Sequence, residues 1–328
     1  MPAVPRLSGY AGIALGIALL AALAIASLTV GVGRMNLLSL VSGGDADAVR
    51  LLVVSRIPRT LAVMLSGAAM GIAAVIMQML FRNRFVEPTT SGTVEAASLG
   101  LVGVAVLAPG LPVAAKMLVA ASFSLLATFL FLRLIDRIPA RGVLIVPLVG
   151  LMLGGVIEAS ATFIAYRYDL LQSLATWTNG DFSGVLRGRY ELLWVGFGLA
   201  ALAYFTADRF TVAGLGEAFT TNLGLDYRRI VAIGLTIVSM VTAASVVTVG
   251  TVPFFGLIVA NLVAMAAGDN LRRSLPWIAL AGAAFLLACD LAGRLIRYPY
   301  EIPVGTVVGV LGSAIFLVII LRREARLG

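Results

Sequence analysis

Arginines and prolines at the borders of apolar runs are the first residues of this chain that could do chemistry. Arg56 and Arg59 flank Pro58 directly before a long apolar run, and Arg294 and Arg297 stand at the end of another. Proline is a natural residue for the first turn of a helix. Arginines at this level either reach lipid headgroups with their charged ends or bind carboxylates of a partner protein. The residues alone leave both uses open.

Carboxylates inside apolar runs are the second group of candidates. Glu87, Glu95, Glu158 and Asp290 all lie in or beside such runs. An acidic side chain in a membrane is costly and tends to mark a transport pathway or an ion pair. Glu87 suits a structural role, as the partner of a nearby arginine or of a helix N-terminus. We expect Glu158 and Asp290 to be the better candidates for residues that face a cavity on the transport pathway, or for proton sites in a different mechanism.

The composition lacks residues that several common types of protein site require. The chain has no histidine, one cysteine (Cys289) and one lysine (Lys116). These counts speak against a haem site, a metal site and an iron–sulfur site. Lys116 does not lie in the glycine-rich turn that cradles phosphate in ATPases. We therefore predict no catalytic, cofactor or metal residues and no enzyme, so any ATP must be hydrolysed by another subunit.

The apolar content predicts an all-α polytopic membrane protein. Of 328 residues, 60% are hydrophobic and 12% are charged, although the net charge is +8. Arginines in short clusters between apolar runs are typical of membrane loops and do not indicate nucleic-acid binding. Runs of about 20 apolar residues can cross a bilayer. We predict one domain, residues 1–328, with about ten transmembrane helices near residues 9–30, 58–81, 93–109, 114–133, 142–165, 191–207, 230–249, 252–267, 275–296 and 303–321.

The basic residues also predict an orientation. With ten spans, arginines are somewhat more frequent in loops on the side of the two termini, which favours cytoplasmic N- and C-termini. The loop at about 210–229 then faces the cytoplasm. It is polar and glycine-punctuated, with Gly216, Glu217, Leu223 and Gly224 as its marked residues. It is either an ordinary loop or a lever, made of two short helices around Gly224, that seats in a partner's groove.

Glycine and proline suggest where helices are broken or closely packed. Pro253 and Gly256 interrupt the start of the eighth run, and such breaks are tolerated where the backbone lines a cavity. We therefore add Pro253 and Gly256 to the pathway candidates. Glycine pairs four residues apart, such as Gly67 and Gly71, favour close helix contacts.

Three motifs occur in order along the chain: Arg56-Ile57-Pro58-Arg59-Thr60, Gly250-Thr251-Val252-Pro253-Phe254-Phe255-Gly256-Leu257 and Tyr300-Glu301-Ile302-Pro303-Val304-Gly305. Together they resemble the FecCD family of ABC-transporter permeases. This resemblance covers residues from about 50 to 323 and implies a bundle similar to the vitamin B12 importer permease, of type II importer fold. It also implies a second permease subunit, identical or different, two ATP-binding-cassette subunits and a substrate-binding protein, at the bacterial inner (plasma) membrane.

The resemblance also implies roles for single residues. The outside arginines Arg56, Arg59 and Arg294, with Arg297 as a further candidate, would pair with glutamates of the binding protein. The residues Gly216, Glu217, Leu223 and Gly224 would belong to the segment that couples to the ATPases. The family often has Pro-His where this chain has Ala260-Asn261, so no role of that pair is carried over.

The function implied is import of an iron(III)-siderophore chelate from a binding protein into the cytoplasm, driven by ATP. Residues 85–93 look most like the subgroup for catecholate-type siderophores. An ion- or proton-coupled secondary transporter that uses Glu158 or Asp290 is the alternative, and a membrane enzyme ranks third because no nucleophile–base or metal-ligand set supports it.

Overall fold

The structure, a computed structural model, describes residues 10–31, 46–138, 145–268 and 270–324. Every regular element in these ranges is helical. Short elements lie between the long helices: α3 (Ala46–Leu51), a π-helical turn (Leu52–Arg56), a 3-10 turn (Pro88–Thr90), α8 (Leu171–Thr178) and α10 (Glu217–Asn222). The long helices are α1 (Tyr10–Thr29), α4 (Ile57–Leu80), α5 (Thr93–Leu107), α6 (Val113–Asp136), α7 (Ile145–Arg167), α9 (Leu192–Ala213), α11 (Tyr227–Thr248), α12 (Phe255–Ala267), α13 (Leu271–Ile296) and α14 (Val304–Glu324).

Each apolar run predicted from the sequence overlaps one of these long helices, which confirms the all-α class. Among the described residues, six segments are long and apolar enough to cross a membrane, while α5, α12 and the apolar part of α14 are shorter. The number of crossings, predicted as about ten, is therefore supported for six helices and stays a prediction for the others.

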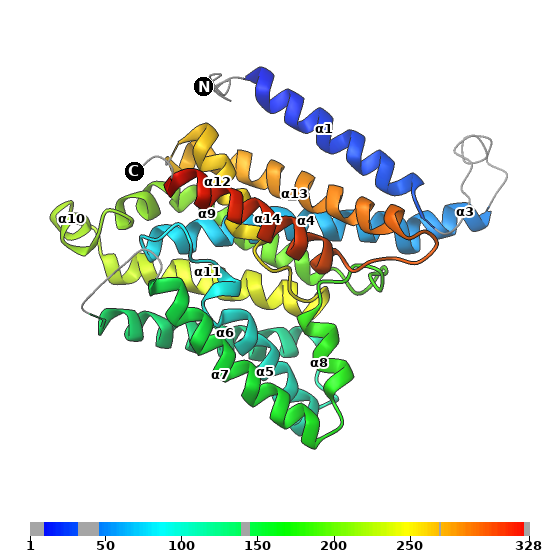
Figure 1. The fold of residues 1–328 in the computed structure, drawn as a ribbon, viewed down its shortest axis with the longest axis horizontal. Helices are drawn as coiled ribbons and strands as arrows, with labels where there is room; N and C mark the ends of the chain where they lie inside the picture. Colours follow the sequence, from blue (N-terminus) through cyan, green and yellow to red (C-terminus); the bar gives the residue numbers. More distant parts are fainter. Residues whose placement is uncertain (1–9, 32–45, 139–144, 269, 325–328) are drawn as a thin grey trace.

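Helix α4 forms the centre of the bundle. It packs against α13, α9, α11 and α12, and nearly all of its side chains are buried. A helix that is apolar on all sides is surrounded either by other helices or by lipid, and α4 is surrounded by helices. By contrast, α1 lies at the edge of the molecule against α13 (Figure 1), and few of its side chains are buried. Exposed apolar side chains on a membrane protein are suited to contact with lipid.

A glycine pair lets α4 and α13 approach closely. A β-carbon on Gly67 would lie 2.5 Å from the carbonyl oxygen of Gly282, and a β-carbon on Gly282 would lie 2.4 Å from the carbonyl oxygen of Gly67. Neither position can therefore hold a larger residue without moving a backbone. The prediction that Gly67 belongs to a close helix contact is confirmed. Helices in lipid gain nothing from the hydrophobic effect when they associate, so close packing at small residues holds them together.

The buried carboxylate of Glu87 fixes the start of α12. It lies in the segment between α4 and α5, and its Oε2 accepts a hydrogen bond of 2.9 Å from the backbone N–H of Leu257. The backbone N–H of Glu87 in turn binds Thr90 Oγ1 at 2.9 Å. The first N–H groups of a helix have no partner within the helix and attract negative charge. The structural role expected for Glu87 is confirmed, with a helix N-terminus as its partner.

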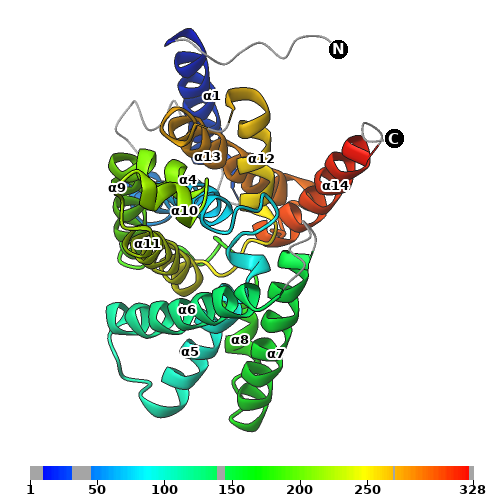
Figure 2. The ribbon, with the colours of Figure 1, turned by 90° about the vertical axis from the view of Figure 1, so that its left-hand side faces the viewer.

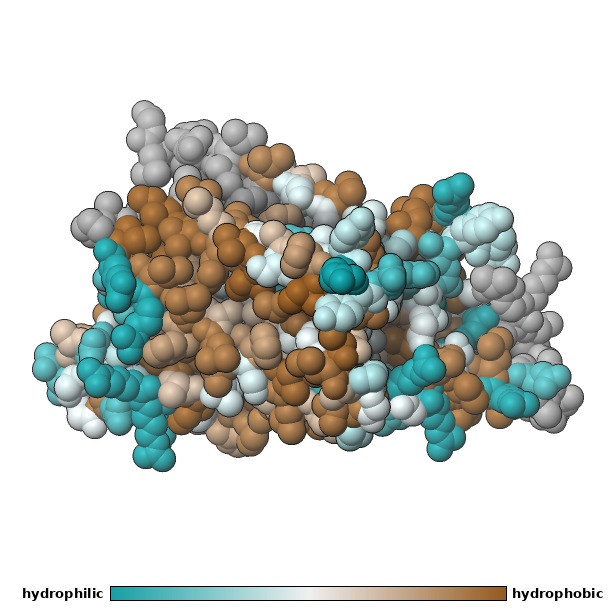
Figure 3. Space-filling model, turned by 90° about the horizontal axis from the view of Figure 1, so that it is seen from below, coloured by the Kyte–Doolittle hydropathy of each residue, from teal (hydrophilic) through white to brown (hydrophobic). Residues whose placement is uncertain are grey.

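The surface agrees with a bundle that lies across a bilayer. Hydrophobic side chains cover much of the middle of the face seen in Figure 3, and hydrophilic side chains gather toward its two ends. The start of α1 and the end of α14 lie at the same end as α10 (Figure 1). We call this the α10 end of the bundle, and the end near α3 and α8 the opposite end.

Candidate functional site

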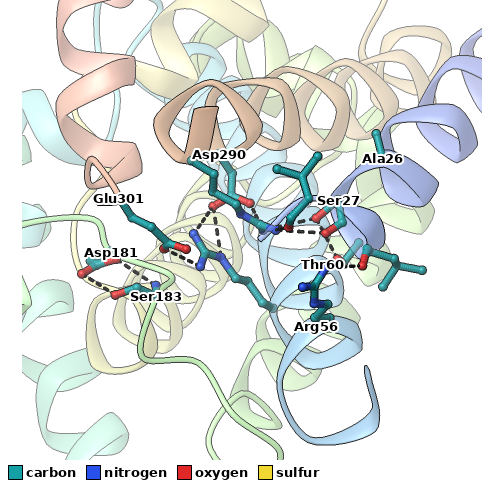
Figure 4. A network of polar contacts seen from close by, with 12 residues as sticks. Ala26, Ser27, Arg56, Thr60, Asp181, Ser183, Asp290 and Glu301 are labelled. Carbon is teal, nitrogen blue, oxygen red and sulfur yellow. Dashed lines mark hydrogen bonds and ion pairs between the residues drawn. The ribbon is translucent and has the colours of Figure 1, made fainter. Parts of the chain in front are cut away.

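A network of buried charges lies at the opposite end of the bundle. The guanidinium of Arg59 donates to Asp290 Oδ1 through Nη2 at 2.8 Å and to Glu301 Oε2 through Nη1 at 2.6 Å. Arg294 donates to the other oxygen of Asp290. The side chain of Asp290 is fully buried, and that of Glu301 is 25% exposed. Figure 4 shows Asp290 and Glu301 facing the same centre from different segments.

Two arginines of this region also hold the end of α1. Arg294 Nη1 donates to the carbonyl oxygens of Ser27 and Val30, at 3.0 and 3.1 Å. Arg56 Nη1 donates to the carbonyl oxygen of Leu28 at 2.7 Å. The last carbonyls of a helix have no partner within it and favour cations. The network thus ties together α1, α4, α13 and the segment before α14.

The predicted docking arginines occupy two different environments. Arg56 and Arg294 are 6% and 4% exposed, and the side chain of Arg59 is 11% exposed. Arg297 is exposed, with its guanidinium 5.8 Å from the ring centroid of Tyr300. The structure brings three of the four arginines together, but their partners lie within this chain. The docking role predicted for these four arginines stays a prediction.

The two carboxylates predicted for a pathway are not brought together. Asp290 lies between two guanidinium groups and has no exposed surface, which corrects the expectation that it faces a cavity. Glu158 is exposed on α7. It borders an open cavity of about 600 Å³ that Gly155, Thr162 and Phe163 also line. A pathway role for Glu158 stays a prediction.

The break at the start of the eighth run has a packing role. A β-carbon on Gly256 would lie 2.3 Å from Ala74 Cβ and 2.6 Å from Glu87 Oε2. Gly256 is therefore required by the close approach of α4 and of the Glu87 cap, and it is buried, which corrects its assignment to a cavity wall. Pro253 lies nearby and is half-buried, close to Gly309 of α14. Its pathway role stays a prediction.

The segment predicted to couple to a partner forms one short helix at the α10 end. Gly216 and Gly224 bracket α10 with φ angles of 113° and 75°, a region that strongly favours glycine. The hydroxyl of Thr220 donates to the carbonyl oxygen of Gly216 at 2.7 Å and fixes the turn. The second short helix expected after Gly224 does not exist, because Asp226 caps the backbone N–H of Arg229 and α11 begins at Tyr227.

The surface of this segment is apolar. Leu215, Phe219 and Leu223 are 60%, 49% and 56% exposed, and Glu217 is exposed beside them. We call Leu215, Glu217, Phe219 and Leu223 the α10 patch. Large apolar side chains that gather on a turn at the polar end of a membrane protein are typical of a protein-binding surface.

The sequence did not single out two contributors to the charged network. Glu301 is part of the Tyr-Glu-Ile-Pro-Val-Gly motif, yet only the fold shows that it binds Arg59 over 242 positions of chain. Ser27 binds Arg294 through both its carbonyl and its hydroxyl. A serine in an apolar run carries no local signal for such a role, because its partner comes from a distant helix.

Comparison with known proteins decides the family. The FecCD transport family matches residues 15–322. The chain belongs to this family. It is 47% identical over 307 residues to the petrobactin import system permease protein YclN of Bacillus subtilis, covering 94% of this chain and 97% of that protein. It is 40% identical over 271 residues to the ferric-anguibactin transport system permease protein FatD of Vibrio anguillarum, covering 83% and 86%.

A solved structure supports the fold of this FecCD member. The chain superposes on an ABC transporter of metal-chelate type in an inward-facing conformation, with a TM-score of 0.76 and 23% sequence identity. The superposition covers 95% of this chain and 99% of the other. The predicted resemblance to the FecCD family is therefore confirmed over nearly the whole length, and the chain is a transport permease.

Proposed function

We propose that this chain is the membrane-spanning permease subunit of an ATP-binding-cassette importer for an iron(III)-siderophore chelate. The observation that carries the proposal is the similarity, along nearly the full length of both chains, to a permease of a petrobactin import system. The similarity to a ferric-anguibactin permease supports an iron chelate as the cargo. Within this class, residues 85–93 favour a catecholate-type siderophore.

The assembly would have two ATPase subunits. Each permease subunit would contact one of them through its α10 patch. Its apolar side chains are exposed, and Thr220 and the two glycines hold them on a defined turn. A defined turn can transmit a rigid movement, which a flexible loop cannot. ATP would be bound and hydrolysed entirely on the partners, so this chain would need no cofactor.

The binding protein is proposed to dock at the opposite end. Arg297 is the exposed member of the four predicted arginines and is the first candidate to meet a carboxylate of the binding protein. Arg59 follows, because its partner Glu301 is partly exposed. Docking through Arg56 or Arg294 would require their bonds to α1 to be released.

A second permease subunit, identical or different, is proposed to complete the pathway. Helix α7 supports this proposal because much of its surface is exposed, including Leu148, Met152, Val156 and Phe163, beside the cavity that Glu158 borders. In the full proposal, residues 1–328 act as one permease domain with about ten crossings in the bacterial inner (plasma) membrane. Its N- and C-termini, with the coupling segment, would face the cytoplasm.

Secondary transport is not retained as a second candidate. Of its two proposed carboxylates, Asp290 is held between Arg59 and Arg294. Loss of its charge would leave the buried Arg294 without a carboxylate and Arg59 with Glu301 alone.

Uptake into proteoliposomes tests the proposed function. The vesicles would contain this chain with its co-purifying subunits, the binding protein outside and ATP trapped inside. We expect uptake of radiolabelled ferric siderophore only when ATP and binding protein are both present. Uptake that ignores ATP and collapses with a proton ionophore would contradict the importer and direct attention to Glu158.

A further inference from the structure

A second cavity lies at the α10 end, beside the α10 patch and apart from the charged network. Its volume is about 260 Å³, and it lies between the end of α4, the end of α9, α12 and the start of α13. Figure 2 looks onto this end of the bundle, where these helices surround one region. The volume is just below the roughly 300–1,000 Å³ of pockets that bind drug-sized ligands, so a small organic molecule or a lipid headgroup would fill it.

The charged side chains of this cavity are all cationic. Arg82 and Arg84 line it, and none of the described residues that line it is an aspartate or glutamate. Other parts of the wall are apolar, including Val75, Ala264 and Ile278. Guanidinium groups bind the oxygens of phosphate with paired hydrogen bonds. The lining therefore suits a ligand in which an anionic group is attached to an apolar group.

A buried polar group without a partner also points to a ligand. Gln78 lines the cavity and is only 7% exposed. Its amide nitrogen makes no hydrogen bond within the part of the chain that the structure describes. A buried donor left without a partner is costly, and native structures rarely keep one without a reason. An acceptor oxygen bound in the cavity would supply the missing partner.

Arg82 has a left-handed backbone conformation, which is unfavourable for a residue with a side chain. The N–H of Arg82 binds the carbonyl of Met79 at 3.1 Å, and the N–H of Asn83 binds that of Gln78 at 3.0 Å. This pair of backbone hydrogen bonds is typical of a helix that ends at a residue in the left-handed conformation, which is usually glycine. Here the residue is Arg82, with a φ of 49°. Glycine would satisfy the backbone better, but it would remove a cation from the cavity.

We propose that this cavity binds a phosphate-bearing anion, through Arg82, Arg84 and the amide of Gln78. The phosphate belongs either to a lipid headgroup of the surrounding membrane or to a small organic phosphate from solution. The site adjoins the α10 patch, because Leu215 lines the cavity and a β-carbon on Gly216 would lie 3.0 Å from Arg82 Nη1. A bound anion would therefore stabilise the turn that carries the patch. The proposal does not depend on the transported substrate.

Thermal unfolding of the purified full-length chain tests the site. In detergent, glycerol 3-phosphate would be titrated against sodium chloride of equal ionic strength. In nanodiscs, phosphatidylcholine alone would be compared with phosphatidylcholine that contains phosphatidic acid. We expect a saturable rise in the melting temperature in at least one arm. A rise with glycerol 3-phosphate alone identifies a soluble phosphate, and a rise with phosphatidic acid alone identifies a lipid headgroup.

Three variants separate binding from folding. Arg82→Gly should fold at least as well as the wild type, because glycine suits the backbone there, but it should lose the anion-dependent rise. Gln78→Leu should bind about tenfold more weakly, because a hydrogen bond to a charged group is lost. Arg137→Gln, an exposed arginine that does not line the cavity, should behave as the wild type. Two results would overturn the proposal. One is that the melting temperature of the wild type shows no saturable rise in either arm. The other is that Arg82→Gly keeps the same anion-dependent rise, with the same titration midpoint, as the wild type.

Discussion

At the scale of residues, Asp290 is the centre of the charged network. Its carboxylate is fully buried and binds both Arg59 and Arg294, and Arg294 also holds the end of α1. Buried ion pairs contribute little net stability relative to apolar residues, but the loss of one partner leaves a buried charge uncompensated. The network is therefore more sensitive to a change at Asp290 than to one at its rim.

We expect Asp290→Asn to lower the free energy of unfolding by about 3–5 kcal/mol, because two buried guanidinium groups lose their shared carboxylate. Glu301→Gln is the matched control. It removes a carboxylate that is partly exposed, while Arg59 keeps Asp290. Chemical denaturation of the purified chain in detergent measures both changes. Equal losses for the two variants would show that Asp290 has no special position in the network.

At the scale of helices, the crossing of α4 and α13 sets the core of the bundle. At Gly67 and Gly282 the two backbones approach so closely that either β-carbon would lie within 2.5 Å of a carbonyl oxygen. Packing between helices in a membrane relies on such close contact, because lipid is as apolar as the side chains. A single methyl group at this crossing therefore has an effect that the same group elsewhere does not have.

Gly67→Ala should destabilise the chain by about 1–3 kcal/mol, the usual cost of overpacking a core. Gly103→Ala on α5 is the control, since a β-carbon at that position would meet no other atom within 4 Å beyond its chain neighbours and the backbone of its own helix. There alanine should be neutral or stabilising by up to about 1 kcal/mol, because glycine weakens a helix. Melting temperatures of the two purified variants decide the matter. A stabilising effect at Gly67 would contradict the observed crossing.

The short helix α10 leads to a second prediction at this scale. Because Phe219 and Leu223 are exposed in the α10 patch, replacing both with serine should weaken association with the proposed ATPase by tenfold or more, as expected for central apolar contacts. Glu217→Arg should also weaken it. Leu186→Ser, the same change at an exposed leucine in the loop between α8 and α9, serves as the control. Co-purification at fixed subunit ratio measures association, and normal recovery of ATPase with all variants would contradict the coupling role.

At the scale of the whole molecule, the two ends of the bundle have different proposed partners. The α10 end carries the α10 patch and the cavity with Arg82, and the opposite end carries the charged network and Arg297. This separation suits a protein that passes a substrate from one side of a membrane to the other. The orientation in the membrane then decides which partner each end can meet.

Single-cysteine labelling tests the orientation. The native Cys289 is buried, so the wild type should give little reaction with a membrane-impermeant maleimide. Arg189→Cys, at an exposed position of the opposite end, should be labelled in intact spheroplasts. Thr221→Cys, exposed on α10, should be labelled only after the membrane is opened. The reverse pattern would place the coupling segment outside and contradict the proposed assembly.

The sequence by itself determined the class, the positions of the helices and the family. Apolar runs are local features, and a bilayer accepts only segments that satisfy their own backbone hydrogen bonds, so each predicted run became a helix. The motifs around Arg56 and Tyr300 were sufficient to indicate the FecCD family. The lack of histidine and the single cysteine spoke against haem, metal and iron–sulfur sites before the structure was considered.

Only the tertiary structure decided which polar residues meet. Asp290 was predicted to face a cavity, yet it binds Arg59, 231 positions away in the chain. Gly256 was predicted to line a pathway, yet it gives room to the carboxylate of Glu87. The physical reason is the same in both cases. Hydropathy records how strongly a residue avoids water, whereas the partner that compensates a buried charge is supplied by another helix, and helix packing is not written in any local pattern.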